Sequence, residues 1–172
     1  MRMAKLLSLV VVTGLLIASL PAEAQQPVAP PPPQIPYGTP ISLEQAKKVM
    51  AGSEAEAKKN NWNVVIAVLD SGGHLVMLQR LDGTQLGSID AAKDKAYSAV
   101  LYRRPTKVFQ DLVGQGGSNL RLLRLAGASP LEGGIPIVVD GKIVGAIGVS
   151  GVTSGQQLAT PRQIRIGLRY EF

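Results

Sequence analysis

The chain has 172 residues, of which 45% are hydrophobic and 17% charged, a globular composition with enough material for one core. It contains no cysteine, which excludes disulfides, thiolate nucleophiles, cysteine metal sites and covalent cofactor attachment through sulfur. Only 4% of the residues are aromatic, so we expect no nucleic acid among its partners. The formal net charge of +6 favours solubility and attracts anionic small molecules.

Residues 1–24 have the pattern of a secretory signal peptide. Arg2 and Lys5 precede an uncharged apolar run over residues 6–20, and Ala-Glu-Ala at 22–24 fits a cleavage site. The apolar run is shorter than the roughly 20 residues that a membrane-spanning helix needs. We therefore expect cleavage, a periplasmic or secreted protein, and no stable membrane span afterwards.

Residues 25–40 are rich in proline, with seven prolines among the sixteen residues QQPVAPPPPQIPYGTP. Proline removes backbone donors and favours an extended polyproline II conformation. This segment is predicted to be a spacer and not part of the fold.

Helical and strand patterns alternate after residue 41. Ser42 and Gln45 fit a capping box, so a helix is predicted from there to the Asn-Asn pair at 60–61. Its apolar stripe is predicted to contain Leu43, Ala46, Met50 and Ala57.

The next elements are a predicted hairpin and a second helix. Two apolar runs, over residues 64–69 and 74–79, flank the turn sequence Asp-Ser-Gly-Gly. Ser88 is expected to cap the helix, and Pro105 is expected to end it. Its apolar face is predicted to consist of Ile89, Ala92, Ala96, Ala99 and Val100.

The last part of the pattern contains a short helix and a second hairpin. The helix is predicted over residues 106–113, and the segment 119–125 supports no assignment. An Asp-Gly pair at 140–141 joins strands predicted at 135–139 and 142–149 through a type I′ turn. Strand pairs separated by helices predict an α+β fold in a single domain, with one antiparallel sheet covered by helices on a face.

Two stretches together resemble the GlcG/HbpS family, which also includes the C-terminal domain of the PduO proteins. They are VVIAVLDSGGHLVMLQRLDG at 64–83 and GGIPIVVDGKIVGAIGVSG at 133–151, within a match over about residues 41–155. The resemblance implies a profilin-like antiparallel sheet flanked by helices and assembly into homo-oligomers. It also implies non-covalent haem binding, which some members show, so that haem is a possible cofactor.

The tail at 156–172 departs from the pattern of this family. Members continue with an acidic start and a helix that packs on the sheet, whereas this chain has Pro161 and the arginines at 162, 165 and 169. The tail is therefore predicted to be divergent or frameshifted. Loss of the closing helix would expose apolar sheet surface, or leave a partner chain to cover it.

His74 is the only histidine of the chain and the candidate metal ligand. A neutral imidazole can bind haem iron or act as a general base, although a position after a Gly-Gly turn equally suits a solvated strand end. Tyr97, Tyr102 and Met77 are the other possible iron ligands, and packing is the usual role of each.

Three further places carry candidate ligand-binding groups. Arg80 and Asp82 follow a predicted strand and either hold an anionic ligand or pair with each other. Lys95 lies among alanines on the second helix and points either into a pocket or toward solvent. The third place is a turn whose glycines either let backbone amides approach a ligand or simply allow the chain to turn. This turn comprises Glu132, Gly133 and Gly134.

The sequence contains no recognisable catalytic motif. A nucleophile elbow, a phosphate-binding loop with its lysine, and the H-E-x-x-H zinc motif are all missing. Two hypotheses follow. The first is an exported haem-binding protein for haem handling or sensing, and the second is an enzyme or binding protein for a small carboxylate metabolite.

Overall fold

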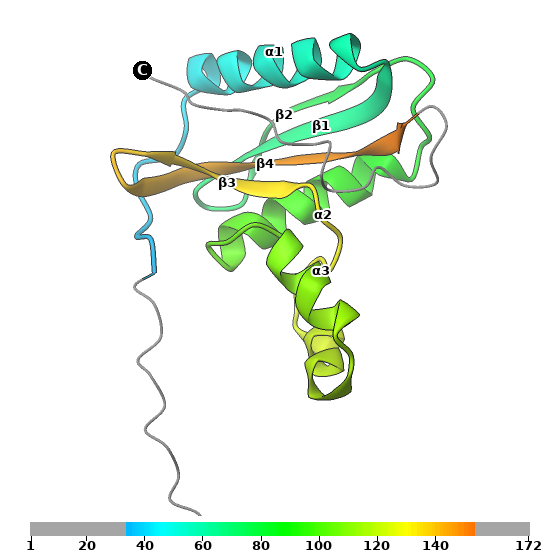
Figure 1. Cartoon of the computed structure of the whole chain (residues 1–172). Helices are drawn as coiled ribbons and strands as arrows, with labels where there is room; N and C mark the ends of the chain where they lie inside the picture. Colours follow the sequence, from blue (N-terminus) through cyan, green and yellow to red (C-terminus); the bar gives the residue numbers. More distant parts are fainter. Residues whose placement is uncertain (1–33, 154–172) are drawn as a thin grey trace, which may run out of the picture. The chain divides into compact units, whose positions relative to one another are not determined.

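The computed structural model describes residues 34–153, in which helices pack on both faces of a four-stranded antiparallel sheet (Figure 1). The strand order is β2-β1-β4-β3. The elements are α1 (Leu43–Lys59), β1 (Trp62–Asp70), β2 (Leu75–Arg80), α2 (Ser88–Leu101), α3 (Lys107–Gly114), the 3-10 helix η1 (Gly117–Arg124), β3 (Gly134–Val139) and β4 (Lys142–Thr153). The predicted signal peptide, residues 25–33 of the spacer and the tail at 156–172 lie outside the described residues. The predicted α+β class is confirmed.

Strand β1 is buried on both sides, which explains its unbroken apolar sequence. Val64, Ile66 and Val68 belong to a core cluster with α1, whereas the alternate residues from Val65 to Leu69 pack with α2. Helices thus cover both faces of the sheet, whereas the sequence pattern had predicted helices on one face only.

Helix α1 begins at the predicted capping box. The amide of Gln45 donates to the Ser42 hydroxyl at 3.2 Å, and the amide of Ser42 donates to the Gln45 side chain at 3.0 Å. The predicted stripe is buried except for Leu43, which is 51% exposed because it lies in the first turn, away from the sheet. Its assignment to the core was wrong.

Helix α2 lies very close to the sheet because small residues face each other across the contact. A Cβ atom added to Gly148 of β4 would lie 2.0 Å from the carbonyl oxygen of Ala92. The predicted apolar face of α2 is confirmed, with its alanines fully buried. The predicted cap is wrong, because Gly87 is the N-cap and Ser88 lies buried inside the helix.

The β3–β4 hairpin turns at Asp140 and Gly141, whose φ angles are 49° and 72°. Two consecutive positive φ angles are what a type I′ turn requires, so this prediction is confirmed. Strand β3 lies at the sheet edge, where Pro136 removes a backbone donor without leaving a neighbouring strand unpaired.

Residues 36–41, which we call the strap, run beside the start of β4. The amide of Ile143 donates to the carbonyl of Pro36, and Gly38 donates back to Ile143, each at 2.8 Å. The Tyr37 hydroxyl donates to the carbonyl of Val100 at 2.9 Å. The folded part thus begins before residue 41, within the segment predicted as a spacer.

Helices α3 and η1 form an arm that extends away from the sheet (Figure 1). Phe109 anchors it, because its buried ring packs edge-on against Tyr102 with ring centroids 5.2 Å apart. The segment 119–125, which the sequence left unassigned, lies mostly in η1, and η1 contains no buried residue. Among residues 34–153, no helix has the length and hydropathy needed to cross a bilayer.

Candidate functional site

The structure distributes the predicted site residues over three separate places. Arg80 and Asp82 line a pocket of about 440 Å³ together with Trp62, near the start of β1 and the end of α1. The two side chains form no ion pair with each other. This pocket, the Trp62 pocket, contains neither His74 nor Lys95.

His74 lies in the turn between β1 and β2, at the opposite end of β1 from the Trp62 pocket. Its side chain is 83% exposed, and its Nδ1 atom lies 3.4 Å from Oδ1 of Asp70. The same oxygen accepts hydrogen bonds from the backbone amides of Gly72 and His74, at 2.8 and 2.9 Å. A carboxylate that contacts Nδ1 orients an imidazole and leaves Nε2 available to a metal ion.

The second pocket has a volume of about 420 Å³ and lies between α2 and the loop before β3. We call it the Tyr97 pocket. It is lined by Asp94, Tyr97, Gly127, Ala128, Ser129, Pro130 and Leu131. The Tyr97 side chain is partly exposed, and its hydroxyl makes no hydrogen bond to another described residue.

The loop of the Tyr97 pocket is attached to α2 at two points. The Tyr102 hydroxyl donates to the carbonyl of Ala126, and the amide of Ser129 donates to the Ser98 hydroxyl at 3.0 Å. Between these points Gly127 adopts a φ of +70° close to the Tyr97 ring. Because both hydroxyls come from α2 or its C-cap, this wall of the pocket is held in place before any ligand arrives.

The Tyr97 ring also touches the turn that carries His74. A Cβ atom added to Gly73 would lie 2.9 Å from Cε2 of Tyr97. His74 is the next residue, although it does not line the pocket. The fold thus brings the histidine turn, which precedes β2, to the border of a pocket built on α2.

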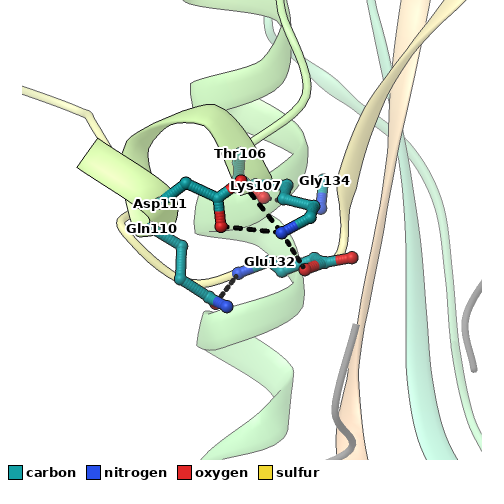
Figure 2. Close-up of polar contacts among 6 residues, drawn as sticks. All are labelled: Thr106, Lys107, Gln110, Asp111, Glu132 and Gly134. Atoms are coloured by element: carbon teal, nitrogen blue, oxygen red, sulfur yellow. Dashed lines mark hydrogen bonds and ion pairs between the residues drawn. The ribbon is translucent and has the colours of Figure 1, made fainter. Parts of the chain in front are cut away.

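Figure 2 shows a cluster of charged side chains in which Lys107 lies between Asp111 and Glu132. Lys107 Nζ lies 2.7 Å from Oδ1 of Asp111 and 3.8 Å from Oε2 of Glu132. The amide of Glu132 donates to the Gln110 side chain at 2.8 Å. We call Lys95, Lys107, Asp111 and Glu132 the charge cluster; the side chains of Lys107 and Asp111 are about half exposed.

Lys95 reaches this cluster from α2 and is 9% exposed. Its Nζ atom donates to the carbonyl oxygen of Val149 at 3.1 Å. Burial lowers the pKa of Lys95, and the nearby Glu132 carboxylate opposes that shift. The Lys95 side chain therefore points into the protein and not toward solvent.

Glu132 is the other charged member of the cluster that is largely shielded from solvent. Its side chain is 15% exposed, and Oε2 has no hydrogen-bond partner among the described residues. Burial raises the pKa of the carboxyl group, and Asp111 raises it further, while Lys107 and Lys95 lower it. The group thus retains a proton to higher pH than an exposed glutamate.

The two glycines after Glu132 are required by packing. A Cβ atom on Gly134 would lie 2.1 Å from the carbonyl oxygen of Lys95, and one on Gly133 would lie 2.5 Å from that of Val149. The amide of Gly134 donates to the Thr106 hydroxyl at 3.0 Å. The amides of Glu132 and Gly134 are therefore already hydrogen-bonded to Gln110 and Thr106, and neither is free to bind a ligand.

The pocket and the cluster lie close together along the chain, because sequence neighbours contribute to each. Asp94 lines the pocket and Lys95 belongs to the cluster, and the same holds for Leu131 and Glu132. The sequence analysis missed Lys107 and Asp111. Their spacing of four suggests an ion pair on a helix, but nothing in the sequence connects that pair with Glu132, which follows only after η1.

The Tyr97 pocket has groups that suit a haem. Tyrosine is a known axial ligand of haem iron, and the open Tyr97 oxygen faces no competing partner among the described residues. Pro130 and Leu131 add apolar surface for the macrocycle. Within residues 34–153, no group of three or more histidine, cysteine or acidic side chains is placed to hold a metal ion by itself.

Comparison with known proteins agrees with this fold. GlcG of Escherichia coli strain K12 is 43% identical over 110 residues, which are 64% of this chain and 81% of that protein. The crystal structure of an HbpS double mutant from Streptomyces reticuli is 32% identical, with a TM-score of 0.60. That likeness covers 75% of this chain and 86% of HbpS.

A crystal structure of a complex between PduOC and haem shares the fold at a TM-score of 0.63 and 22% identity, over 74% of this chain and 90% of PduOC. Residues 41–160 match the family model described as haem degrading protein HbpS-like. The resemblance inferred from the sequence is thus confirmed, and this chain belongs to the HbpS-like family.

Proposed function

We propose that this chain binds haem non-covalently in the Tyr97 pocket and acts outside the cytoplasm, in haem handling or sensing. The observation that carries the proposal is the Tyr97 hydroxyl, which lines a pre-formed pocket and has no hydrogen-bond partner among the described residues. Membership of the HbpS-like family supports it, as does the haem complex of PduOC, which has the same fold.

Tyr97 is the iron ligand that the geometry favours, and His74 is the competing one. Tyr97 lines the pocket directly, whereas His74 lies on the bordering turn with its Nδ1 atom toward Asp70. When bound, the haem would supply the iron chemistry. The chain's own contribution is to present one open oxygen or nitrogen, to offer apolar surface and to exclude part of the solvent.

Two cationic side chains have different relations to this pocket. Lys95 follows Asp94 of the pocket lining, and its ammonium group would add positive charge near a haem propionate while it donates to the Val149 carbonyl. Arg80 lines the Trp62 pocket. Arg80 is therefore not expected to contact a haem in the Tyr97 pocket, and Arg80→Ala serves as a control.

The experiment is a hemin titration of the full chain, followed in the Soret region. We expect a saturable change with one haem per chain. Tyr97→Phe is expected to weaken binding roughly ten-fold or more, because it removes the iron ligand, and to shift the Soret band. His74→Ala and Arg80→Ala are expected to retain the wild-type spectrum.

The alternative outcomes are distinct. If His74→Ala alters the spectrum while Tyr97→Phe does not, the iron ligand belongs to the histidine turn. If the wild-type chain shows no saturable Soret change, haem binding is wrong, and the small carboxylate hypothesis takes its place.

Export is checked separately: the intact mass of the protein from the periplasm is expected to correspond to an N-terminus at Gln25.

A further inference from the structure

The α3–η1 arm presents apolar side chains that nothing in the described structure covers. Leu120 is 48% exposed and Leu123 is 57% exposed, and both lie on η1, which buries no residue. Val108 and Leu125 add further exposed apolar surface at 37% and 40%. Four exposed large aliphatic residues thus lie within residues 108–125, and such a concentration is typical of a binding surface.

The geometry of η1 arranges these residues in rows. A 3-10 helix has three residues per turn, so side chains three positions apart lie directly above one another. Leu120 and Leu123 therefore form one row, and Arg121 and Arg124 form the adjacent row. Neither arginine side chain makes a hydrogen bond or ion pair with another residue in the range 34–153.

The charge around the arm is predominantly positive. Arg103, Arg104 and Lys107 lie at its base, and between residues 103 and 125 Asp111 is the single acidic residue. Lys107 is already bound to Asp111, whereas the two arginines of η1 are on the outside. An occupant of this surface must therefore offer both negative charge and an apolar medium.

Two occupants from the chain itself fit this requirement poorly. A second copy that paired arm to arm would bring the same arginines together, and each chain carries a net charge of +6. The tail after residue 153 carries three arginines and one glutamate, so it adds positive charge as well. Like charges placed opposite each other destabilise such contacts.

We propose that the α3–η1 arm binds the surface of an anionic phospholipid membrane. Leu120 and Leu123 would enter the boundary between headgroups and acyl chains, while Arg121 and Arg124 would contact phosphate groups. Short amphipathic segments with adjacent leucine and arginine faces bind such interfaces without spanning them. This surface is distinct from the Tyr97 pocket, so the two sites can be tested separately.

The test uses a local fluorescent label, because the apolar segment at residues 6–20 of the full chain can itself associate with lipid. The chain has no cysteine, so Ser118→Cys allows an environment-sensitive dye to be placed beside the leucine row. Gln85→Cys places the same dye beside Leu86, which is 72% exposed but has no arginine row. Each labelled chain is titrated with vesicles of equal parts phosphatidylglycerol and phosphatidylcholine, and with pure phosphatidylcholine vesicles.

We expect a blue shift for the label at position 118 with the anionic vesicles only. Replacing both Leu120 and Leu123 by asparagine is expected to abolish the shift. Replacing Arg121 and Arg124 by glutamine is expected to raise the lipid concentration at half-maximal shift about 30-fold, and added salt should act in the same direction. Leu86→Asn serves as the matched control and should change nothing.

Three results would overturn the proposal. The first is an unshifted label at position 118, and the second is an equal shift with pure phosphatidylcholine. The third is a shift that needs no vesicles and grows with protein concentration, which would assign the arm to a second copy of the chain.

Discussion

Gly134 shows how a single residue can be specified by the backbone of a distant element. Its φ angle lies outside the left-handed region, so a side chain there is excluded by space and not by backbone strain. The sequence indicated that the Gly-Gly pair forms a turn. It could not indicate that the carbonyl of Lys95, on the distant helix α2, occupies the position of the missing Cβ.

Gly134→Ala is therefore expected to lower the free energy of unfolding by about 3 kcal/mol or more, because the methyl group would meet backbone atoms that cannot move aside cheaply. The matched control is Gly114→Ala at the end of α3, where no atom lies within 4 Å of the added Cβ. The control is expected to leave stability unchanged or slightly higher. Urea unfolding of both variants checks this, and equal losses would contradict it.

The environment of Glu132 predicts a pH-dependent contribution to stability. Burial raises the pKa of its carboxyl group in the folded state above the ordinary value of 4.5. The folded protein then binds more protons than the unfolded chain between those two pKa values. The corresponding stability is fully present below pH 4.5 and is lost as pH rises through the raised pKa.

Glu132→Gln should remove this dependence, because the amide has a similar shape and does not titrate. We expect the wild-type chain to lose stability relative to the variant as the pH rises above 4.5. Urea unfolding from about pH 4 to about pH 8 measures the difference. A difference that stays constant over that range would show that the Glu132 pKa is the same in both states.

At the scale of elements, two serines illustrate what a sequence pattern can specify. Ser42 and Gln45 are three residues apart, and both hydrogen bonds of a capping box depend only on that local spacing. Ser88, like Ser42, is a serine that precedes an apolar run. The helix nevertheless begins one residue earlier, because the segment from Gln85 makes turn-like hydrogen bonds into it.

The two serines should respond in opposite ways to replacement by alanine. Ser42→Ala is expected to lower the free energy of unfolding by about 1 kcal/mol, because the amide of Gln45 loses its acceptor. Ser88→Ala is expected to be neutral or stabilising, since the buried Ser88 hydroxyl has no hydrogen-bond partner in the described structure. Thermal unfolding of both variants measures the contrast, and a larger loss for Ser88→Ala would refute it.

The elements differ in how well periodicity predicts them. The helices α1 and α2 were predicted because their apolar residues repeat every three to four positions, and the two hairpins because apolar runs flank turn sequences. The 3-10 helix η1 repeats every three residues and buries no side chain, so its sequence has no stripe that a core would impose. The Tyr97 pocket was missed for a related reason, since its lining comes from α2 and from a loop that follows only after α3 and η1.

At the scale of the whole molecule, the strap connects the proline-rich segment to the sheet. Pro36, Gly38 and Ile41 exchange backbone hydrogen bonds with the start of β4, where β1 has already ended. Proline content predicted a spacer, but it could not show that backbone groups of residues 36–41 would form hydrogen bonds with β4.

Deletions should therefore have a sharp boundary. A chain without residues 25–33 is expected to keep the wild-type free energy of unfolding. Extending the deletion to residue 38 should cost about 1–3 kcal/mol, because the hydrogen bonds of Pro36, Tyr37 and Gly38 to β4 and α2 are lost. Urea unfolding of both chains tests this. Equal stability would mean that the strap contributes nothing to the fold.

The close approach of α2 to β3 and β4 also determines which parts of the protein can move. At Gly134 and Gly148 no side chain separates the strands from the backbone of α2, so sliding at these points would require backbone movement. We therefore expect α2 and these two strands to move together. Any conformational response to a ligand in the Tyr97 pocket is then expected at the histidine turn on one side and at the 126–131 loop with its arm on the other.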